Sequence, residues 1–388
     1  MEQQSNEFRN SITPKRTLLF IHSMRGGGSE RQLSYLANEL AGRGETCLVT
    51  LDRPSPDSYA LDARIHRVWL NLTTNRGGLG RGLLANIRRI RSLRRVIIDW
   101  KPNVLVSFCD TNNILALLAC PASIPIVISE RSDPRHQKLS RLWEWLRRIV
   151  YPKCACCIVQ TDEVGNYLAS GKRLSSSQFR VIPSAIQSPS MNLSAISSGR
   201  IGTKTKNLIY VGRLSKEKRI DRLLHAWAAM ESHHGDWVLK IAGDGTEREP
   251  LKKLAESLGI TKAIQWLSWS DDIWSLLKTA HAYCLVSQYE GFPQSMLEAM
   301  ATGLPVAVLD CSPAVREVIS DGVNGLIIPD ESQIVASLDR LLSDESLRTV
   351  LGQNAAIRAQ EYEWSKIATK WLSILEIQAS TRLQSGHS

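Results

Sequence analysis

The chain has 388 residues, which is too long for one ordinary hydrophobic core and predicts about two domains. A hydrophobic content of 43% and a charged content of 22% are typical of globular proteins, and no run of about 18 apolar residues predicts a membrane-spanning helix. The N-terminus lacks the apolar core of a signal peptide, and the eight cysteines show no paired metal-ligand spacing. We therefore expect a cytoplasmic protein with reduced thiols and no bound metal.

The formal net charge of +10 is distributed unevenly. Residues 1–199 carry 27 Lys and Arg against 15 Asp and Glu, whereas residues 200–388 carry 21 against 23. The first half therefore holds the whole positive excess. Such an asymmetry predicts an anionic partner for that half, which is a membrane surface, a phosphorylated substrate or a nucleic acid.

The first half alternates predicted strands and helices after a polar lead of residues 1–14. Strands are expected at 16–22, 46–51, 66–70, 103–108, 125–129, 156–160 and 179–183, and helices at 32–41, 83–100, 113–120 and 139–150. This alternation predicts a parallel sheet covered by helices. Residues 185–205, rich in Ser, Asn and Gly, predict a linker.

The second half repeats the alternation. Strands are expected at 207–212, 237–242, 263–267, 282–287 and 305–309, and helices at 220–231, 247–258, 272–280, 295–302, 331–342, 345–360 and 364–378. The fold class that we predict is α/β, with two Rossmann-like doubly wound domains that face each other across a cleft. In such a fold the ligand lies beyond the carboxyl ends of the strands.

The stretch from Glu290 to Glu298 places two carboxylates on either side of a Gly-Phe-Pro turn, between an apolar strand and a helix. Backbone N–H groups and the positive end of the helix dipole would point toward a ligand there. An anion surrounded by hydroxyls, such as a nucleotide sugar, suits this chemistry. The alternative is a helix that is opened by one acid and carries the other as a solvated charge.

Tyr210-Val-Gly-Arg213 ends a predicted strand, and Lys218 follows just before a helix. Two cations that converge at a strand end can neutralise a diphosphate, since Arg offers a planar fork and Lys a point charge. The alternative is a charged surface loop.

Two glycine-containing turns follow other predicted strands. Gly27 and Gly28 lie in a glycine-rich loop, and Gly243 follows a strand within Gly-Asp-Gly. Bare backbone lets a sugar or diphosphate approach closely, although a flexible turn would look the same. A dinucleotide fingerprint is not met, because Arg31 occupies the position of its last glycine.

The helix at 83–100 carries an arginine stripe formed by Arg88, Arg91 and Arg95, with Arg81 added if the helix starts early. Leu83, Ile87, Ile90, Leu93 and Ile97 are expected on the opposite face. The stripe suits a row of phosphates on a lipid diphosphate acceptor and the surrounding membrane, and Arg147, Arg148 and Lys153 would extend it. The alternative is a solvated helix face. Asp110, at another strand end, either orients an acceptor hydroxyl or caps a helix.

Several of these motifs resemble the signature of retaining glycosyltransferases of family 4, which have the GT-B fold. The matching segments are Glu290-Gly-Phe-Pro through Glu298-Ala-Met-Ala-Thr-Gly-Leu-Pro-Val306, Val211-Gly-Arg213 with Lys218, and Gly27-Gly-Ser-Glu-Arg31. Ser129-Glu-Arg-Ser-Asp-Pro134 is similar to a segment of members that extend lipid-linked or lipopolysaccharide glycans. Two positions depart from the pattern: Leu267 is followed by Ser where Leu-Gly is usual, and no His occurs near Phe108.

The resemblance implies domain boundaries and roles. It implies an acceptor-side domain at 1–184, a linker at 185–205, a nucleotide-sugar-binding domain at 206–362, and a helix at 363–380 that crosses back to the first domain. The implied catalytic residues are Glu290, Lys218 and Arg213, of which Arg213 and Lys218 hold the donor's β-phosphate. The implied donor-binding residues are Gly27, Gly28, Arg213, Lys218, Gly243, Leu267, Glu290, Gly291, Phe292, Pro293, Gln294 and Glu298, and the acceptor or membrane residues are Asp110, Arg81, Arg88, Arg91 and Arg95.

The expected function is transfer of a sugar from a nucleoside-diphosphate sugar, with UDP the expected nucleotide, to a lipid-linked or polysaccharide glycan. The new linkage would be α, and the protein would work without a metal or other cofactor at the anionic inner face of the cell membrane, with no nucleic-acid partner. One alternative is a nucleotide-sugar epimerase or phosphorylase of the same fold. Another is a non-catalytic module that binds anionic membrane.

Overall fold

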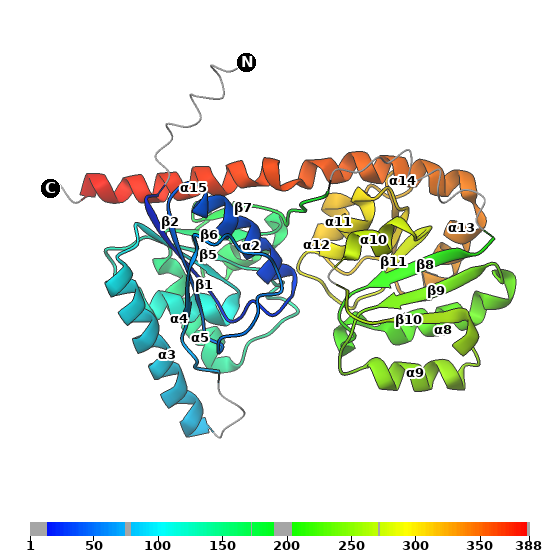
Figure 1. The fold of residues 1–388 in the computed structure, drawn as a ribbon, viewed down its shortest axis with the longest axis horizontal. Coiled ribbons are helices and arrows are strands. Elements are labelled where there is room, and N and C mark those ends of the chain that lie inside the picture. The colour runs from blue at the N-terminus through cyan, green and yellow to red at the C-terminus, as the bar shows by residue number, and fades with distance from the viewer. Residues whose placement is uncertain (1–13, 74–78, 172, 190–203, 271, 386–388) are drawn as a thin grey trace, which may run out of the picture. The chain divides into compact units, whose positions relative to one another are not determined.

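A computed structural model describes residues 14–73, 79–171, 173–189, 204–270 and 272–385 (Figure 1). The chain divides into two compact units, of which one comprises Met1–Ser184 with Trp364–Ser388 and the other Ala185–Glu363. Most of the predicted linker, residues 190–203, lies outside the described residues.

The first unit is built on a parallel sheet with the order β3-β2-β1-β4-β5-β6-β7. Its strands are β1 (Arg16–Ile21), β2 (Glu45–Thr50), β3 (His66–Trp69), β4 (Val104–Phe108), β5 (Ile126–Ser129), β6 (Cys156–Val159) and β7 (Phe179–Val181). The central strands β1, β4, β5 and β6 are almost wholly buried. Strands buried on both faces read as continuous apolar runs, which is why the sequence predicts them well.

Helices pack on this sheet: α2 (Gly28–Ala41), α3 (Leu79–Trp100), α4 (Asp110–Ala119), α5 (Arg141–Val150), α6 (Asp162–Ser170) and α15 (Trp364–Ser385). Helix α4 packs against both α3 and α5. The C-terminal α15 belongs to this unit, where Trp364 lies 5.7 Å from Tyr35 and Trp371 stacks on Phe108 at 5.6 Å between ring centroids. A segment distant in sequence thus covers the sheet through aromatic contacts.

The second unit has a parallel sheet with the order β10-β9-β8-β11-β12-β13. Its strands are β8 (Lys206–Val211), β9 (Trp237–Ala242), β10 (Ile264–Leu267), β11 (Ala282–Leu285), β12 (Val306–Leu309) and β13 (Leu326–Ile328). Its helices are α8 (Ile220–Met230), α9 (Arg248–Ser257), α10 (Ile273–Lys278), α11 (Gln294–Ala301), α12 (Pro313–Val318), α13 (Ile334–Ser343) and α14 (Glu345–Ala359). Side chains of Asp272, Ser312 and Asp344 cap α10, α12 and α14, each accepting a backbone N–H in the first turn.

Both sheets follow the strand order 3-2-1-4-5-6 of doubly wound folds, which confirms the predicted α/β class of two Rossmann-like domains. Leu83, which was predicted on the face of α3 opposite the arginine stripe, is 59% exposed. Leu93 and Ile97, further along the helix, are fully buried. None of the described helices is long and apolar enough to cross a bilayer.

Candidate functional site

The strand order reverses direction at one place in each sheet, between β1 and β4 and between β8 and β11. Open α/β sheets bind ligands beyond the carboxyl ends of the strands at such a switch point. In the second unit, the loop after β8 carries Arg213 and Lys218, and the loop after β11 carries Glu290. The predicted catalytic residues of this unit therefore lie where the topology places a ligand.

Lys218 and Glu290 form an ion pair across this switch point. The Nζ atom of Lys218 lies 2.6 Å from Oε1 of Glu290, and the two side chains are 21% and 11% exposed. The Ser287 hydroxyl donates a second hydrogen bond to the same oxygen at 2.7 Å. The other oxygen, Oε2, has no partner among the described residues and can accept a ligand hydroxyl. The sequence prediction gave Ser287 no role, and its signal is its position two residues after the end of β11.

Hydrogen bonds to Glu217 hold the loop that presents Lys218, one from within the loop and one from the loop after β11. The Ser215 hydroxyl donates to Glu217 at 2.5 Å, and the Gln288 N–H donates to the Glu217 carbonyl at 2.8 Å. Burial alone would raise the pKa of Glu217, but the Ser215 hydrogen bond, a backbone hydrogen bond and the cations Lys218 and Arg213 lower it below its usual value. Arg213 itself is exposed and has no carboxylate within ion-pair distance in the described chain.

Tight backbone contacts join the ends of β8, β9 and β10. Gly243 has φ +147°, and a Cβ there would lie 1.9 Å from the Gly212 carbonyl oxygen. The Gly243 N–H donates to the Leu267 carbonyl at 3.3 Å, and Arg248 Nη1 donates to both the Gly243 and the Leu267 carbonyls, at 2.7 and 3.1 Å. Gly243 is therefore needed for close packing of neighbouring loops.

The turn after Glu290 leads into α11 without a side-chain cap. Pro293 is the N-cap residue, and Gly291 is half-buried. The Phe292 side chain is 8% exposed, and its ring centroid lies 6.0 Å from that of Tyr362. The side chain therefore belongs to the core, and only the Phe292 backbone is left to contact a ligand. The Gln294 amide donates to the Ala185 carbonyl at 2.7 Å. Glu298, in the second turn of α11, is 2% exposed.

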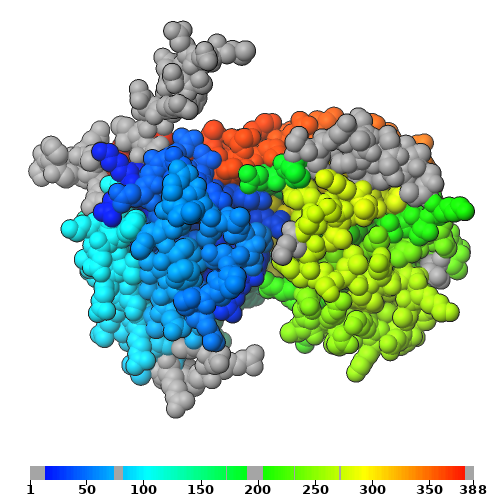
Figure 2. All heavy atoms as spheres, in the orientation of Figure 1, coloured from blue at the N-terminus to red at the C-terminus, as the bar shows by residue number. Residues whose placement is uncertain are grey.

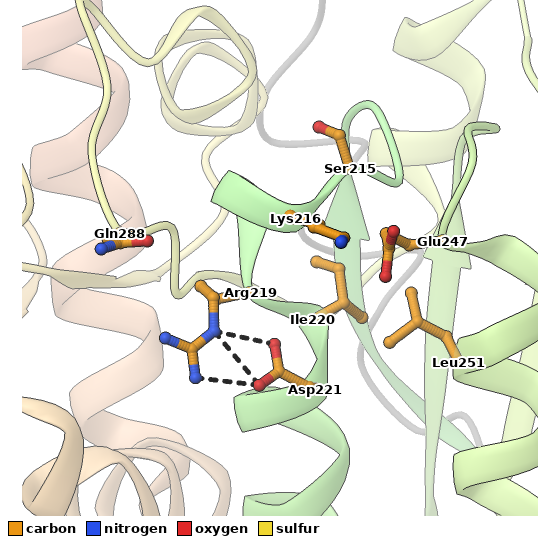
Figure 3. Close-up of a pocket in the computed structure, with 8 residues that line it drawn as sticks. All are labelled: Ser215, Lys216, Arg219, Ile220, Asp221, Glu247, Leu251 and Gln288. Atoms are coloured by element: carbon orange, nitrogen blue, oxygen red, sulfur yellow. Dashed lines mark hydrogen bonds and ion pairs between the residues drawn. The ribbon is translucent and has the colours of Figure 1, made fainter. Parts of the chain in front are cut away.

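A cavity of about 340 Å³ lies beside these loops (Figure 3). Its lining comprises Ser215, Lys216, Arg219, Ile220, Asp221, Glu247, Leu251 and Gln288. Arg219 forms an ion pair with Asp221 at 2.9 Å on its wall. The cavity shares the loop after β8 with Arg213 and Lys218, but neither of them lines it.

The corresponding switch point of the first unit brings together the glycine loop and the end of β4. Gly27 is the N-cap residue of α2, with φ +154°, and its N–H donates to the Tyr59 hydroxyl at 3.1 Å, while Gly28 is the first helical residue. The N-cap residue of α4 is Cys109, not Asp110, so the alternative that Asp110 caps this helix is wrong. Asp110 is 7% exposed, and its Oδ1 accepts the Thr111 N–H at 2.6 Å.

Arg147 lies inside the first unit among carboxylates. Its Nη2 is 3.8 Å from Asp110 and 3.9 Å from Glu130, and its Nη1 is 3.4 Å from Glu144. Tyr151 donates a hydrogen bond to Glu130 at 2.7 Å. Burial raises the pKa of Glu130 to about 7, although Arg147 opposes that rise. The expectation that Arg147 extends the basic surface is therefore wrong, since the side chain is 1% exposed.

The predicted arginine stripe lies on the surface of α3, which contributes light-blue to cyan spheres to the first unit in Figure 2. Arg88, Arg91 and Arg95 are exposed and make no ion pair among the described residues. Arg94, in contrast, donates to the Ala119 carbonyl. Arg81 falls within the helix, but its side chain lies outside the described part.

The fold and the strand-end residues define a class: a GT-B type protein of two doubly wound domains, with cations and a carboxylate at a switch point. Residues 26–188 match the family described as Glycosyltransferase Family 4, and residues 195–358 match Glycosyl transferases group 1. The chain therefore combines a Glycosyltransferase Family 4 domain with a Glycosyl transferases group 1 domain.

Known proteins with similar sequences and structures agree with this assignment. An uncharacterized glycosyltransferase of Haemophilus influenzae is 33% identical over 44% of this chain and 49% of its own, so the matched region spans about half of that relative. The Campylobacter jejuni GalNAc-α-(1→4)-GalNAc-α-(1→3)-diNAcBac-PP-undecaprenol α-1,4-N-acetyl-D-galactosaminyltransferase is 26% identical over 92% of this chain and 96% of its own. The crystal structure of Anabaena HepE in complex with UDP and glucose has a TM-score of 0.70 at 17% identity, over 91% and 97% of the two chains.

Proposed function

We propose that this glycosyltransferase moves a sugar from a nucleoside-diphosphate sugar, with UDP as the nucleotide, to a lipid-linked or polysaccharide glycan with retention of configuration. The product would carry an α-linkage in a cell-surface glycan. The observation that carries the proposal is the grouping of Lys218, Glu290 and Arg213 at the switch point of the second sheet. UDP in the HepE structure and the α-1,4 product in the Campylobacter enzyme's name support the donor and the linkage.

The proposed chemistry separates charge between a departing diphosphate and an oxocarbenium-like sugar. Arg213, Lys218 and the backbone N–H groups near Gly291 stabilise the leaving group. Glu290 accepts hydrogen bonds from sugar hydroxyls through Oε2 and stabilises the developing cation, and Glu298 binds the ribose. Gly243 and Leu267 complete the donor site in the second unit. The acceptor hydroxyl, oriented by Asp110, loses its proton to the leaving phosphate.

Thermal-shift screening against a panel of sugar nucleotides, followed by NMR analysis of the anomeric product, tests this function. A UDP-sugar should raise the Tm, and transfer should retain the anomeric configuration. Sugar-nucleotide conversion without any acceptor would favour an epimerase. Inversion of the anomeric carbon would contradict the proposed mechanism.

Transfer is expected to continue in excess chelator. Arg213 and Lys218 supply the positive charge that a divalent cation would otherwise provide to the diphosphate. Within the described residues, no three His, Cys, Asp or Glu side chains gather to hold a metal ion. Turnover should be compared with and without EDTA after dialysis. Complete loss of activity in EDTA, restored by added Mg²⁺, would refute metal-independent transfer.

We further propose that the first unit binds the anionic inner face of the cell membrane as a peripheral protein. The stripe of Arg88, Arg91 and Arg95 supplies exposed positive charge. Helix α5 adds an apolar face, because Leu142, Trp145 and Ile149 are 57%, 57% and 44% exposed at positions i, i+3 and i+7. Exposed Arg141 and Arg148 flank this face. An apolar face bordered by arginines is typical of interfacial helices.

The triple variant Arg88→Ser, Arg91→Ser and Arg95→Ser should bind anionic vesicles more weakly by on the order of 100-fold, since each basic residue near such a surface contributes about 1 kcal/mol. Vesicle sedimentation at low salt measures this. Arg340→Ser, an exposed arginine on α13, is the matched control and should bind normally. Unchanged binding by the triple variant would contradict a role of α3 at the membrane.

A further inference from the structure

Four arginines of the described chain are buried, but one of them lacks an acidic partner. Arg131, Arg147, Arg173 and Arg348 are all less than a tenth exposed. Arg147, Arg173 and Arg348 each have a carboxylate oxygen within 4 Å. Arg131 has none within the described residues. A buried cation without a counter-ion is costly for a protein, so Arg131 requires an explanation.

The groups that Arg131 contacts directly are neutral. Its Nη2 donates to the Ser184 hydroxyl at 2.8 Å, and the guanidinium carbon lies 5.6 Å from the centre of the Phe108 ring. In the orientation that satisfies both ends of its amide, Gln160 accepts from Nη2 at 3.3 Å and donates to the Arg131 carbonyl. Nε is buried without a hydrogen-bond partner, and Nη1 also makes no hydrogen bond to a described residue. Burial lowers the Arg131 pKa to about 10.

These residues meet at the carboxyl edge of the first sheet. Phe108 ends β4, and Arg131, Gln160 and Ser184 follow β5, β6 and β7. This is the edge at which doubly wound sheets bind ligands. The Cys109 thiol lies near Arg131, and Cys109 has φ +73°. The thiol also interacts with the side chain of Ser29 in the first turn of α2, so the positive end of that helix dipole is near as well. The acids Glu30 and Asp110 lie near Cys109. Asp110 forms its ion pair with Arg147.

We propose that Arg131, supported by Ser184 and Gln160, binds a phosphoryl group of the acceptor. This inference rests on the proposed function, because it assumes a phosphorylated or lipid-diphosphate acceptor. A guanidinium has N–H donors in one plane that match phosphate oxygens. A bound anion would supply the negative charge that no described residue provides next to Arg131. Ser184 and Gln160 fix the guanidinium plane before the ligand arrives. A diphosphate on a lipid acceptor and a phosphate on a glycan would both bind the guanidinium through their oxygens in this way.

The test compares Arg131→Met with Arg147→Met, two substitutions that remove a buried positive charge and keep much of the volume. Arg131→Met should have a Tm equal to or above that of the wild type, because a charge without a partner is lost. Arg147→Met should lower the Tm, because Asp110 and Glu130 lose their cation. A Tm loss for Arg131→Met as large as that for Arg147→Met would overturn the proposal, since Arg131 would then be structural.

The binding arm uses calorimetry with inorganic pyrophosphate and with geranyl diphosphate, in a Lys218→Ala background that weakens the donor site. Arg131→Met should reduce the affinity for these probes at least tenfold, and equal affinities would overturn the proposal. If Arg131→Met loses affinity only for geranyl diphosphate, the site is specific for a lipid diphosphate. If it loses the same affinity for both probes, the site binds phosphate groups in general. This arm needs no transfer activity, so it decides the inference even if the proposed function fails. Where transfer is found, the KM for the acceptor should rise at least tenfold and the KM for the donor should not.

Discussion

Replacement of Lys218 or Glu290 by alanine should lower the rate of sugar transfer by on the order of 10³-fold, because each removes a charge that acts on the reacting groups. In the proposed mechanism, Lys218 supplies positive charge to the leaving diphosphate, and Glu290 holds the sugar and faces its developing positive charge. The ion pair of 2.6 Å between them, with Ser287 on the same oxygen, fixes both side chains before a donor binds. Initial rates with a saturating donor and acceptor measure the effect.

Lys216→Ala is the matched control, because Lys216 lies on the same loop and is exposed. It should transfer within about twofold of the wild type, as expected for a surface change. The double variant Lys218→Ala with Glu290→Ala should lose no more than slightly beyond either single variant, since the two residues act together. All these variants should keep a Tm close to that of the wild type. Near-normal turnover in either single variant would refute the assigned roles.

The sequence predicted the two domains and most strands because buried parallel strands are continuous apolar runs and recur with helices between them. It missed β13, whose three residues, Leu326–Ile328, are too few to stand out from the turn before them. It also missed the short helices α6 and α12, which start at capping residues Thr161 and Ser312 but carry brief apolar patterns. Elements of this length depend on tertiary packing more than on local propensity.

The site was predicted unevenly for a similar reason. Sequence order shows which residues end strands, and this places Arg213, Lys218 and Glu290 at one edge. It does not show which side chains turn inward. Phe292 enters the core, and Arg147 lies on the buried face of an amphipathic helix whose other arginines are exposed. The contrast between Arg131 and Arg147 depends on which carboxylates the fold brings near, and no spacing in the sequence encodes that.

Gly243→Ala should destabilise the second unit by more than about 3 kcal/mol, because strain at positive φ and steric overlap act together. The added Cβ would lie 1.9 Å from the Gly212 carbonyl oxygen, so the ends of β8 and β9 would have to separate. Gly259→Ala is the matched control: φ is +74° there, and no atom lies within 4 Å of the added Cβ. It should lose only about 1–2 kcal/mol, the usual penalty for a left-handed alanine.

Urea unfolding of both variants measures the difference in their free energies of unfolding. Transfer rates show whether the backbone shift also affects the proposed donor site. Gly212 directly precedes Arg213, so the backbone shift that relieves the overlap would also displace the cation proposed to hold the donor diphosphate. A displacement of about 1 Å can lower catalysis on the order of 10²-fold. Gly243→Ala should therefore transfer poorly even at a temperature where it remains folded, while Gly259→Ala, remote from these strand ends, should retain activity. Equal stability and equal rates in the two variants would show that the contact between β8 and β9 positions neither the loop nor Arg213.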